Sequence, residues 1–92
     1  MEIEYDPAKR EQTLENRGLD FDRCHDVFNG PILEMEDTRI KYGESRFIVF
    51  GLLDTRMVVI VWTPRGDRRR IISMRKANER EQQRFREYLD RP

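Results

Sequence analysis

The chain has 92 residues, of which 18 are Lys or Arg and 18 are Asp or Glu, so its formal net charge is zero. A chain of this length favours one domain, residues 1–92, with a thin hydrophobic core. One cysteine and one histidine leave no internal disulfide and no Cys/His zinc site, and no apolar stretch is long enough for a signal peptide or a membrane helix. These features predict a soluble, cytoplasmic protein with no metal and no cofactor.

The N-terminal third predicts a short strand followed by two helices. Residues 2–5 form the strand, and Asp6 and Pro7 are typical of an N-cap and a first helical position. This first helix is expected to stop at Gly18, and Asp20 caps the second helix. The apolar residues of the second helix recur at helical spacing: Phe21, Cys24, Val27 and Phe28.

The middle of the chain predicts an antiparallel meander. The apolar runs 32–36, 46–53 and 57–63 have the length and composition of strands. A turn over residues 63–67 follows, since it contains one proline and one glycine. It leads into a last strand over residues 68–75, so the fold class is α+β with a small antiparallel sheet.

The last predicted strand carries arginines on both of its faces. Simple alternation places Arg69, Ile71, Ser73 and Arg75 on one face, and Arg68, Arg70, Ile72 and Met74 on the other. Because the guanidinium group matches phosphate oxygens, this strand is a candidate phosphate-binding surface. The alternative is that these arginines form an ordinary solvated face.

The final helix is predicted over residues 78–89. Asn78 and Glu81 have the spacing of a capping box, and Phe85, Tyr88 and Leu89 form a narrow apolar stripe. A stripe of this width docks a helix weakly. The helix also carries several arginines. Arg80 and Arg84, together with the apolar Phe85, are candidates to bind an acidic protein partner.

Charge is divided unevenly between the two halves of the chain. Residues 1–54 contain 13 acidic and 7 basic side chains, a net charge of −6, whereas residues 55–92 contain 5 acidic and 11 basic ones, a net charge of +6. Such a division indicates a basic surface for a polyanion or an acidic partner.

Two tracts carry a resemblance to a known family: DPAKREQTLENRGLDFDRCHDVFNGP and YGESRFIVFGLLDTRMVVIVWTPRGDRRRIISMRKANERE. They resemble the BrnT toxins of bacterial type II toxin-antitoxin pairs, over roughly Tyr5 to Tyr88. The resemblance implies a RelE-like ribonuclease fold, a small twisted antiparallel sheet with helices on one face. It also implies RNA cleavage that halts translation.

The same resemblance implies a partner. This is a BrnA-like antitoxin with a ribbon-helix-helix domain, which neutralises the toxin and represses their shared operon, so that operator DNA is bound only through the antitoxin. The sequence departs from the family at Asn16-Arg17-Gly18, where Lys-His-Gly is usual. If the Lys-His pair takes part in the chemistry, activity is altered here.

RNA cleavage without a metal ion needs a base for the 2′-hydroxyl, cations for the phosphorane and a proton for the 5′-oxygen. The candidate catalytic residues, which supply a carboxylate, cations and a hydroxyl, are Glu44, Arg46, Arg70, Ser73 and Arg75. The candidate RNA contacts are Tyr42, Arg65, Arg68 and Lys76. Alternatively, Glu44 and Arg46 form an ordinary surface ion pair, and Ser73 is a small residue in a crowded sheet.

Two other kinds of function stay open from the sequence. A non-catalytic RNA-binding domain would show salt-dependent binding without cleavage. A protein-interaction module would retain the toxin fold only to bind its partner.

Overall fold

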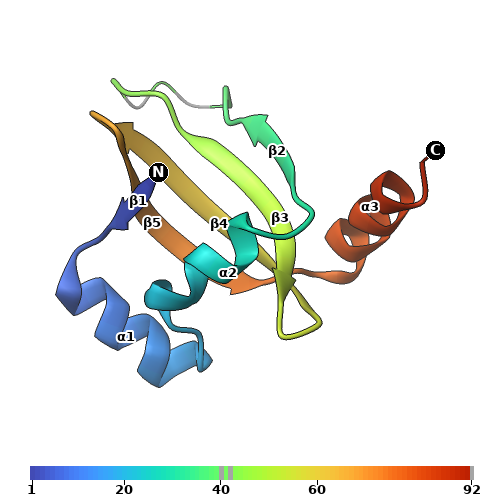
Figure 1. Ribbon diagram of the computed structural model, residues 1–92, viewed down its shortest axis with the longest axis horizontal. Coiled ribbons are helices and arrows are strands. Elements are labelled where there is room, and N and C mark those ends of the chain that lie inside the picture. Colours follow the sequence, from blue (N-terminus) through green and yellow to red (C-terminus); the bar gives the residue numbers. More distant parts are fainter. Residues whose placement is uncertain (40, 42, 92) are drawn as a thin grey trace.

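A computed structural model describes residues 1–39, 41 and 43–91 of the chain. The elements in this part follow in the order β1 (Glu2–Glu4), α1 (Pro7–Arg17), the 3₁₀ turn η1 (Phe21–Arg23), α2 (Cys24–Phe28), β2 (Leu33–Glu36), β3 (Phe47–Leu53), β4 (Arg56–Arg65), β5 (Arg68–Lys76) and α3 (Glu79–Leu89). The described strands form a five-stranded sheet in the order β1-β5-β4-β3-β2 (Figure 1).

The ends of α1 confirm the capping prediction. The Asp6 side chain accepts a hydrogen bond from the Ala8 backbone N–H, and Pro7 is the first helical residue. At the other end Gly18 adopts a left-handed conformation with φ 69°, and its N–H donates to the Leu14 carbonyl. The local sequence therefore sets both boundaries of this helix.

The predicted second helix is split in two. Asp20 caps the 3₁₀ turn η1 by accepting a hydrogen bond from the Asp22 N–H, and α2 begins only at Cys24. Phe21, Cys24 and Val27 are nonetheless fully buried. The apolar spacing thus identified the buried face correctly, although not the type of helix.

The prediction of an entirely antiparallel sheet is wrong at one edge. β2, β3, β4 and β5 are antiparallel neighbours, but β1 pairs in parallel with β5, in the register Glu2 with Arg68 and Glu4 with Arg70. The sheet is therefore mixed. The reason is the connection, because β1 leads into helices and not into a tight hairpin, which alone would require an antiparallel partner.

The predicted faces of β5 are wrong because the strand contains a β-bulge. Val61 pairs with Ser73 and Trp62 pairs with Ile71, so Ile72 is an extra residue in the ladder. Beyond the bulge the alternation is reversed. Arg70 and Arg75, which simple alternation placed on opposite faces, therefore lie on the same face.

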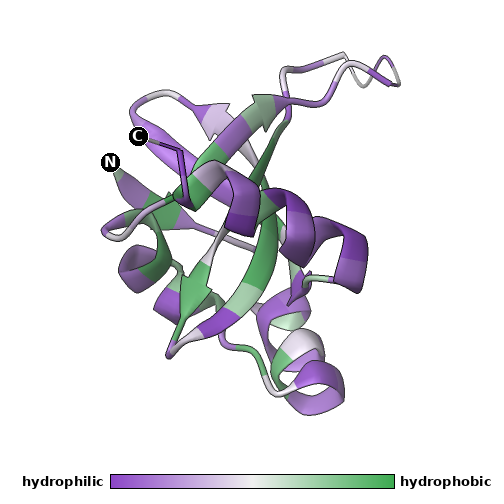
Figure 2. Cartoon of the chain, turned by 90° about the vertical axis from the view of Figure 1, so that its right-hand side faces the viewer, coloured by the Kyte–Doolittle hydropathy of each residue, from purple (hydrophilic) through white to green (hydrophobic). Residues whose placement is uncertain are grey.

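Helices cover both faces of the sheet, so the expectation of helices on one face is also wrong. One hydrophobic cluster joins α2 and η1 to the sheet through residues such as Phe21, Val27 and Ile60. A second cluster joins α3 to the opposite face through Phe85 and Val59. In Figure 2, α3 crosses in front of the sheet with a mostly hydrophilic outer surface.

Cys24 should contribute to stability and not to chemistry. Its side chain is fully buried, its Sγ lies 3.8 Å from Met74 Sδ, and burial raises the pKa of the thiol to about 12. We expect Cys24→Ser to lower the melting temperature, because a hydroxyl in this apolar site costs about 1–3 kcal/mol. RNA cleavage per folded molecule should be unchanged. Cleavage lost at an unchanged melting temperature would contradict this assignment.

Candidate active site

The face of the sheet opposite η1 and α2 is here termed the open face, because α3 covers only one end of it. The pairing register places Val59, Val61 and Thr63 of β4 on this face. Their partners Arg75, Ser73 and Arg70 on β5 share it, as do Ile48 and Phe50 of β3. Two hollows on this face contain most of the predicted site residues.

The first hollow, termed the arginine hollow, has a volume of about 220 Å³. It is lined by Asp6, Lys9, Glu44, Arg46, Thr63, Arg65, Arg70, Ile71 and Ile72. Four residues predicted from the sequence, Glu44, Arg46, Arg65 and Arg70, thus come together here from β4, β5 and the segment before β3. Lys9, which also lines the hollow, was not predicted from the sequence.

Glu44 is the acidic centre of the arginine hollow. Its carboxylate lies 3.6 Å from Arg46 Nε and 3.7 Å from an Arg65 Nη. Thr63, which is buried, donates its hydroxyl to the Ser45 carbonyl at 2.6 Å and so holds the backbone between Glu44 and Arg46. The carboxylate is therefore positioned beside two cations.

Arg70 enters the same hollow from β5 and is held by the edge strand. Its Nη1 donates to Glu4 of β1 at 2.9 Å, and both side chains are about one third exposed, at 32 and 30 %. The exposed Arg68 makes a looser pair with Glu2, at 3.3 Å. Because Glu4 accepts a hydrogen bond from one nitrogen of the Arg70 guanidinium group, the other nitrogens can still donate to a second anion.

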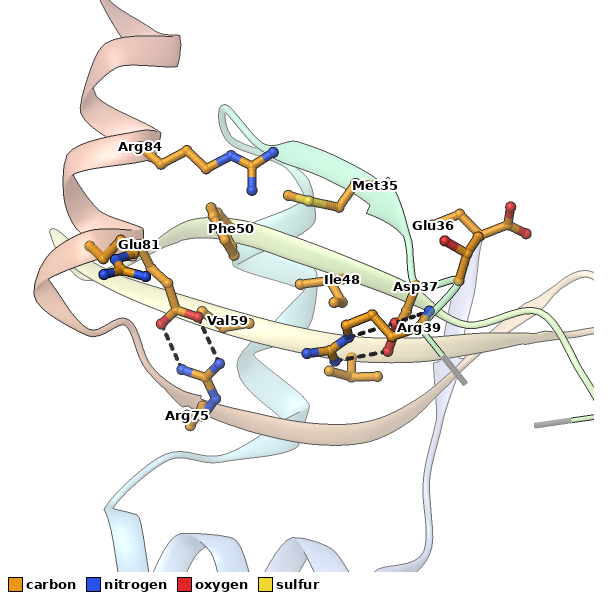
Figure 3. Close-up of a pocket in the computed structure, with 13 residues that line it drawn as sticks. Met35, Glu36, Asp37, Arg39, Ile48, Phe50, Val59, Arg75, Glu81 and Arg84 are labelled. Atoms are coloured by element: carbon orange, nitrogen blue, oxygen red, sulfur yellow. Dashed lines mark hydrogen bonds and ion pairs between the residues drawn. The ribbon is translucent and has the colours of Figure 1, made fainter. Parts of the chain in front are cut away.

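The second hollow, termed the α3 groove, has a volume of about 490 Å³ and lies between α3 and β2 (Figure 3). Its floor is apolar and includes Ile48, Phe50 and Val61. The polar lining residues are Glu36, Asp37, Thr38, Arg39, Arg75, Arg80, Glu81 and Arg84. Arg75 therefore lies apart from the arginine hollow, although on the same face.

Arg75 connects β5 to α3. Two of its nitrogens donate to the two carboxylate oxygens of Glu81 at 2.7 and 2.8 Å (Figure 3). Glu81 also accepts from the Asn78 N–H, which confirms the predicted capping box. The hydrogen bonds from Arg75 lower the pKa of Glu81, and Glu81 raises the pKa of Arg75. This pair holds the first turn of α3 on the sheet.

The docking of α3 should therefore depend on pH. Since the pKa of Glu81 is lower in the folded chain, its stabilising effect is present above the unfolded pKa and is lost as the pH falls through the folded value. We expect the difference in melting temperature between the wild type and Glu81→Gln to be largest at neutral pH and to vanish in acid. A difference that persists unchanged at pH 3 would contradict the assigned role of this pair.

Asp37 and Arg39 form a second ion pair at the α3 groove, which was not predicted from the sequence. The Asp37 side chain is only 3 % exposed, whereas that of Arg39 is 75 % exposed. Arg39 donates from Nε and Nη2 to the two carboxylate oxygens at 2.9 and 3.0 Å. A buried acid after a strand gives little signal in a sequence that is 39 % charged.

Three other predicted residues lie elsewhere. Ser73 lines a hollow with Asn16 and Arg17 of α1, and Lys76 pairs with Val58 on the opposite face of the sheet. Phe85 is 1 % exposed beneath α3. Tyr42 lies outside the described residues.

The departure at residues 16–18 lies at the end of α1. Arg17 donates from Nη1 to the Met74 carbonyl on β5 at 2.9 Å. Arg17 therefore ties α1 to β5 beyond the residues that pair with β1.

A family model described as "Ribonuclease toxin, BrnT, of type II toxin-antitoxin system" matches residues 5–81. The chain belongs to this family. It is a ribonuclease toxin, and membership of a type II system implies a protein antitoxin. The matched range contains every residue that lines the two hollows of the open face except Arg84. The BrnT assignment therefore applies to the residues that form them.

A search of curated proteins finds no match to the chain. In the described part of the BrnT domain, no helix is long and apolar enough to cross a membrane. Over the same residues, no three His, Cys, Asp or Glu side chains gather as a metal site would require.

Proposed function

We propose that this BrnT toxin cleaves RNA in the arginine hollow without a metal ion and thereby inhibits translation. The observation that carries the proposal is the meeting of the Glu44 carboxylate with Arg46, Arg65 and Arg70 in a hollow of about 220 Å³. A phosphate bound between these arginines would place its neighbouring 2′-hydroxyl near a carboxylate that can accept a proton.

In the proposed reaction the 2′-oxygen attacks phosphorus while Glu44 accepts its proton. The bond from phosphorus to the 5′-oxygen breaks, which gives a 2′,3′-cyclic phosphate and a 5′-hydroxyl end. We assign the proton for the leaving oxygen to Lys9, which lines the same hollow. Arg46 and Arg70 stabilise the negative charge of the phosphorane, a contribution typical of positioned donors in enzymes.

Arg75 and Ser73, which were predicted to be catalytic, take more peripheral parts in this proposal. Arg75 borders the α3 groove and Ser73 borders α1. Among the predicted RNA contacts, the exposed Arg68 extends the cationic surface along β5. These residues would guide the RNA strand to the hollow and would contribute to binding that weakens with salt.

The cleavage test uses purified toxin, an RNA substrate and excess EDTA. We expect cleavage in EDTA with cyclic-phosphate ends, and its loss in Glu44→Gln. Glu15→Gln, which changes an exposed carboxylate on α1, is the matched control and should cleave like the wild type. Activity that EDTA removes, or that Glu44→Gln retains, would contradict the proposal.

We propose for the partner a BrnA-like antitoxin with a ribbon-helix-helix domain, through which alone the pair would bind operator DNA. Arg80 and Arg84 line the α3 groove and suit an acidic antitoxin segment. Because Phe85 is buried, an antitoxin could contact it only by displacing α3. Reversing both charges, Arg80→Glu with Arg84→Glu, should weaken the complex with the antitoxin of the neighbouring reading frame, whereas Arg91→Glu should not.

The remaining expectations from the sequence are part of the same proposal. A RelE-like fold and a single domain over residues 1–92 are supported by the sheet that the described strands share. A cytoplasmic location is supported by the activity, because a toxin that halts translation must meet RNA in the cytoplasm.

A further inference from the structure

We infer that the α3 groove holds a guanine base of the RNA strand, whose N–H groups replace Arg39 on the buried carboxylate of Asp37. The inference rests on the proposed function, since it assigns a base preference to that RNA site. It begins from the unequal exposure of this ion pair: 3 % for the Asp37 side chain and 75 % for that of Arg39.

The Asp37 carboxylate can accept two parallel hydrogen bonds from one planar group. Arg39 already donates to both of its oxygens, from Nε and Nη2. Guanine carries the same pattern, because its N1–H and its 2-amino group are two parallel N–H donors on one edge. Adenine has an unprotonated nitrogen at the N1 position, and this lone pair would face the carboxylate. Asp37 can therefore accept two hydrogen bonds from guanine but not from adenine.

The exchange of donors is physically reasonable. The Arg39 side chain is 75 % exposed, so its guanidinium is already largely hydrated while it pairs with Asp37. The incoming base would keep two hydrogen bonds on the buried carboxylate, and Arg75, Arg80 and Arg84, which line the same groove, would supply positive charge in place of Arg39.

The shape and charge of the groove suit a nucleotide. A volume of about 490 Å³ is in the usual range for small-molecule sites. Ile48, Val61 and Met35 give the base an apolar floor. Arg84 reaches from α3 across the groove toward Met35 (Figure 3), and a guanidinium plane in this place can stack on the upper face of a base.

The groove is also next to the proposed cleavage site. Val61 lines the α3 groove and Thr63 lines the arginine hollow. These residues are two apart on β4 and on the same face, a separation of about 7 Å along the strand. Neighbouring nucleotides of one strand can therefore occupy both hollows, with guanine at a fixed position beside the scissile phosphate.

The first test measures binding of mononucleotides to the whole chain, independently of cleavage. We expect GMP to bind about tenfold more tightly than AMP, with IMP, which lacks the 2-amino group, between them. Asp37→Asn should abolish this order, because an amide presents one acceptor and one donor. Asp26→Asn is the matched control. Asp26 also pairs with an arginine, Arg23, but it belongs to α2 and does not line the α3 groove. Equal binding of GMP and AMP to the wild type would overturn the inference.

A second variant makes the test robust if Asp37→Asn fails to fold. Arg39→Ala leaves the carboxylate in place and removes its internal competitor, so we expect GMP to bind more tightly than to the wild type. A purely structural ion pair would give no such gain, and unchanged or weaker GMP binding would overturn the inference.

The inference and the proposed function can fail separately. Asp37-dependent GMP binding without any RNA cleavage would uphold the base site and contradict the catalytic proposal. Cleavage in EDTA with no preference for guanine at any position beside the cut would overturn the base site and leave the catalytic proposal intact.

Discussion

Arg70→Ala should lower the rate of RNA cleavage by a factor of about 10² to 10³ and abolish growth inhibition. Arg70 lines the arginine hollow together with Glu44 and Arg46. Removing one positioned donor from a transition-state charge typically costs about 3–4 kcal/mol. The fold should survive, because Arg70 is one third exposed and its only close ion pair in the described part of the chain is with Glu4.

The measurement is single-turnover cleavage with toxin in excess over RNA, together with a melting curve for each variant. Arg56→Ala is the matched control, because Arg56 is an exposed arginine of the same sheet at the far end of β4. Arg70→Lys should recover only part of the rate, since an ammonium cannot form the two parallel hydrogen bonds of the guanidinium fork. A folded Arg70→Ala protein with full activity would remove this residue from the site.

Phe85→Ala should be the most destabilising change in α3, with a loss of about 3–5 kcal/mol in the free energy of unfolding. Phe85 is the one buried residue of this helix, at 1 % exposure, and it packs with Phe50, Val59 and Ala77. Without this side chain the helix retains the Arg75 pair and its capping box but has no buried anchor. We expect α3 to detach before the sheet unfolds.

Urea unfolding measures the total loss in the free energy of unfolding, and amide hydrogen exchange shows which segment loses its protection. Exchange in Phe85→Ala should rise over α3 and stay slow in β3 and β4. Phe85→Leu keeps most of the buried area and should show a smaller loss of stability. Equal protection of α3 in the wild type and in Phe85→Ala would show that other contacts hold the helix.

The sequence predicted what depends on local chemistry. Asp6, Pro7 and Gly18 set the ends of α1 where expected, and Asn78 with Glu81 forms the predicted capping box. Four predicted site residues also meet in one hollow. The helix caps are encoded by residues a few positions apart. The residues of the hollow were recognised because charged side chains are rare in the interior of a sheet.

The features that the sequence did not predict depend on contacts between distant segments. The bulge at Ile72 follows from how β4 and β5 pair, and it reverses the faces of every later residue on β5. The burial of Asp37 depends on the groove between β2 and α3. Neither the parallel partner of β1 nor the face chosen by α3 has a signal within its own segment.

The most direct test of the central claim is an NMR titration with an RNA that cannot be cleaved because its 2′-hydroxyls are methylated. We expect the largest amide shifts on open-face residues around both hollows, such as Ile48, Val61 and Arg70, and on the first turn of α1, which carries Lys9. Amides of η1 and α2, which cover the other face, should move little. Shifts confined to η1 and α2, with the strands of the open face unaffected, would contradict the proposed cleavage site.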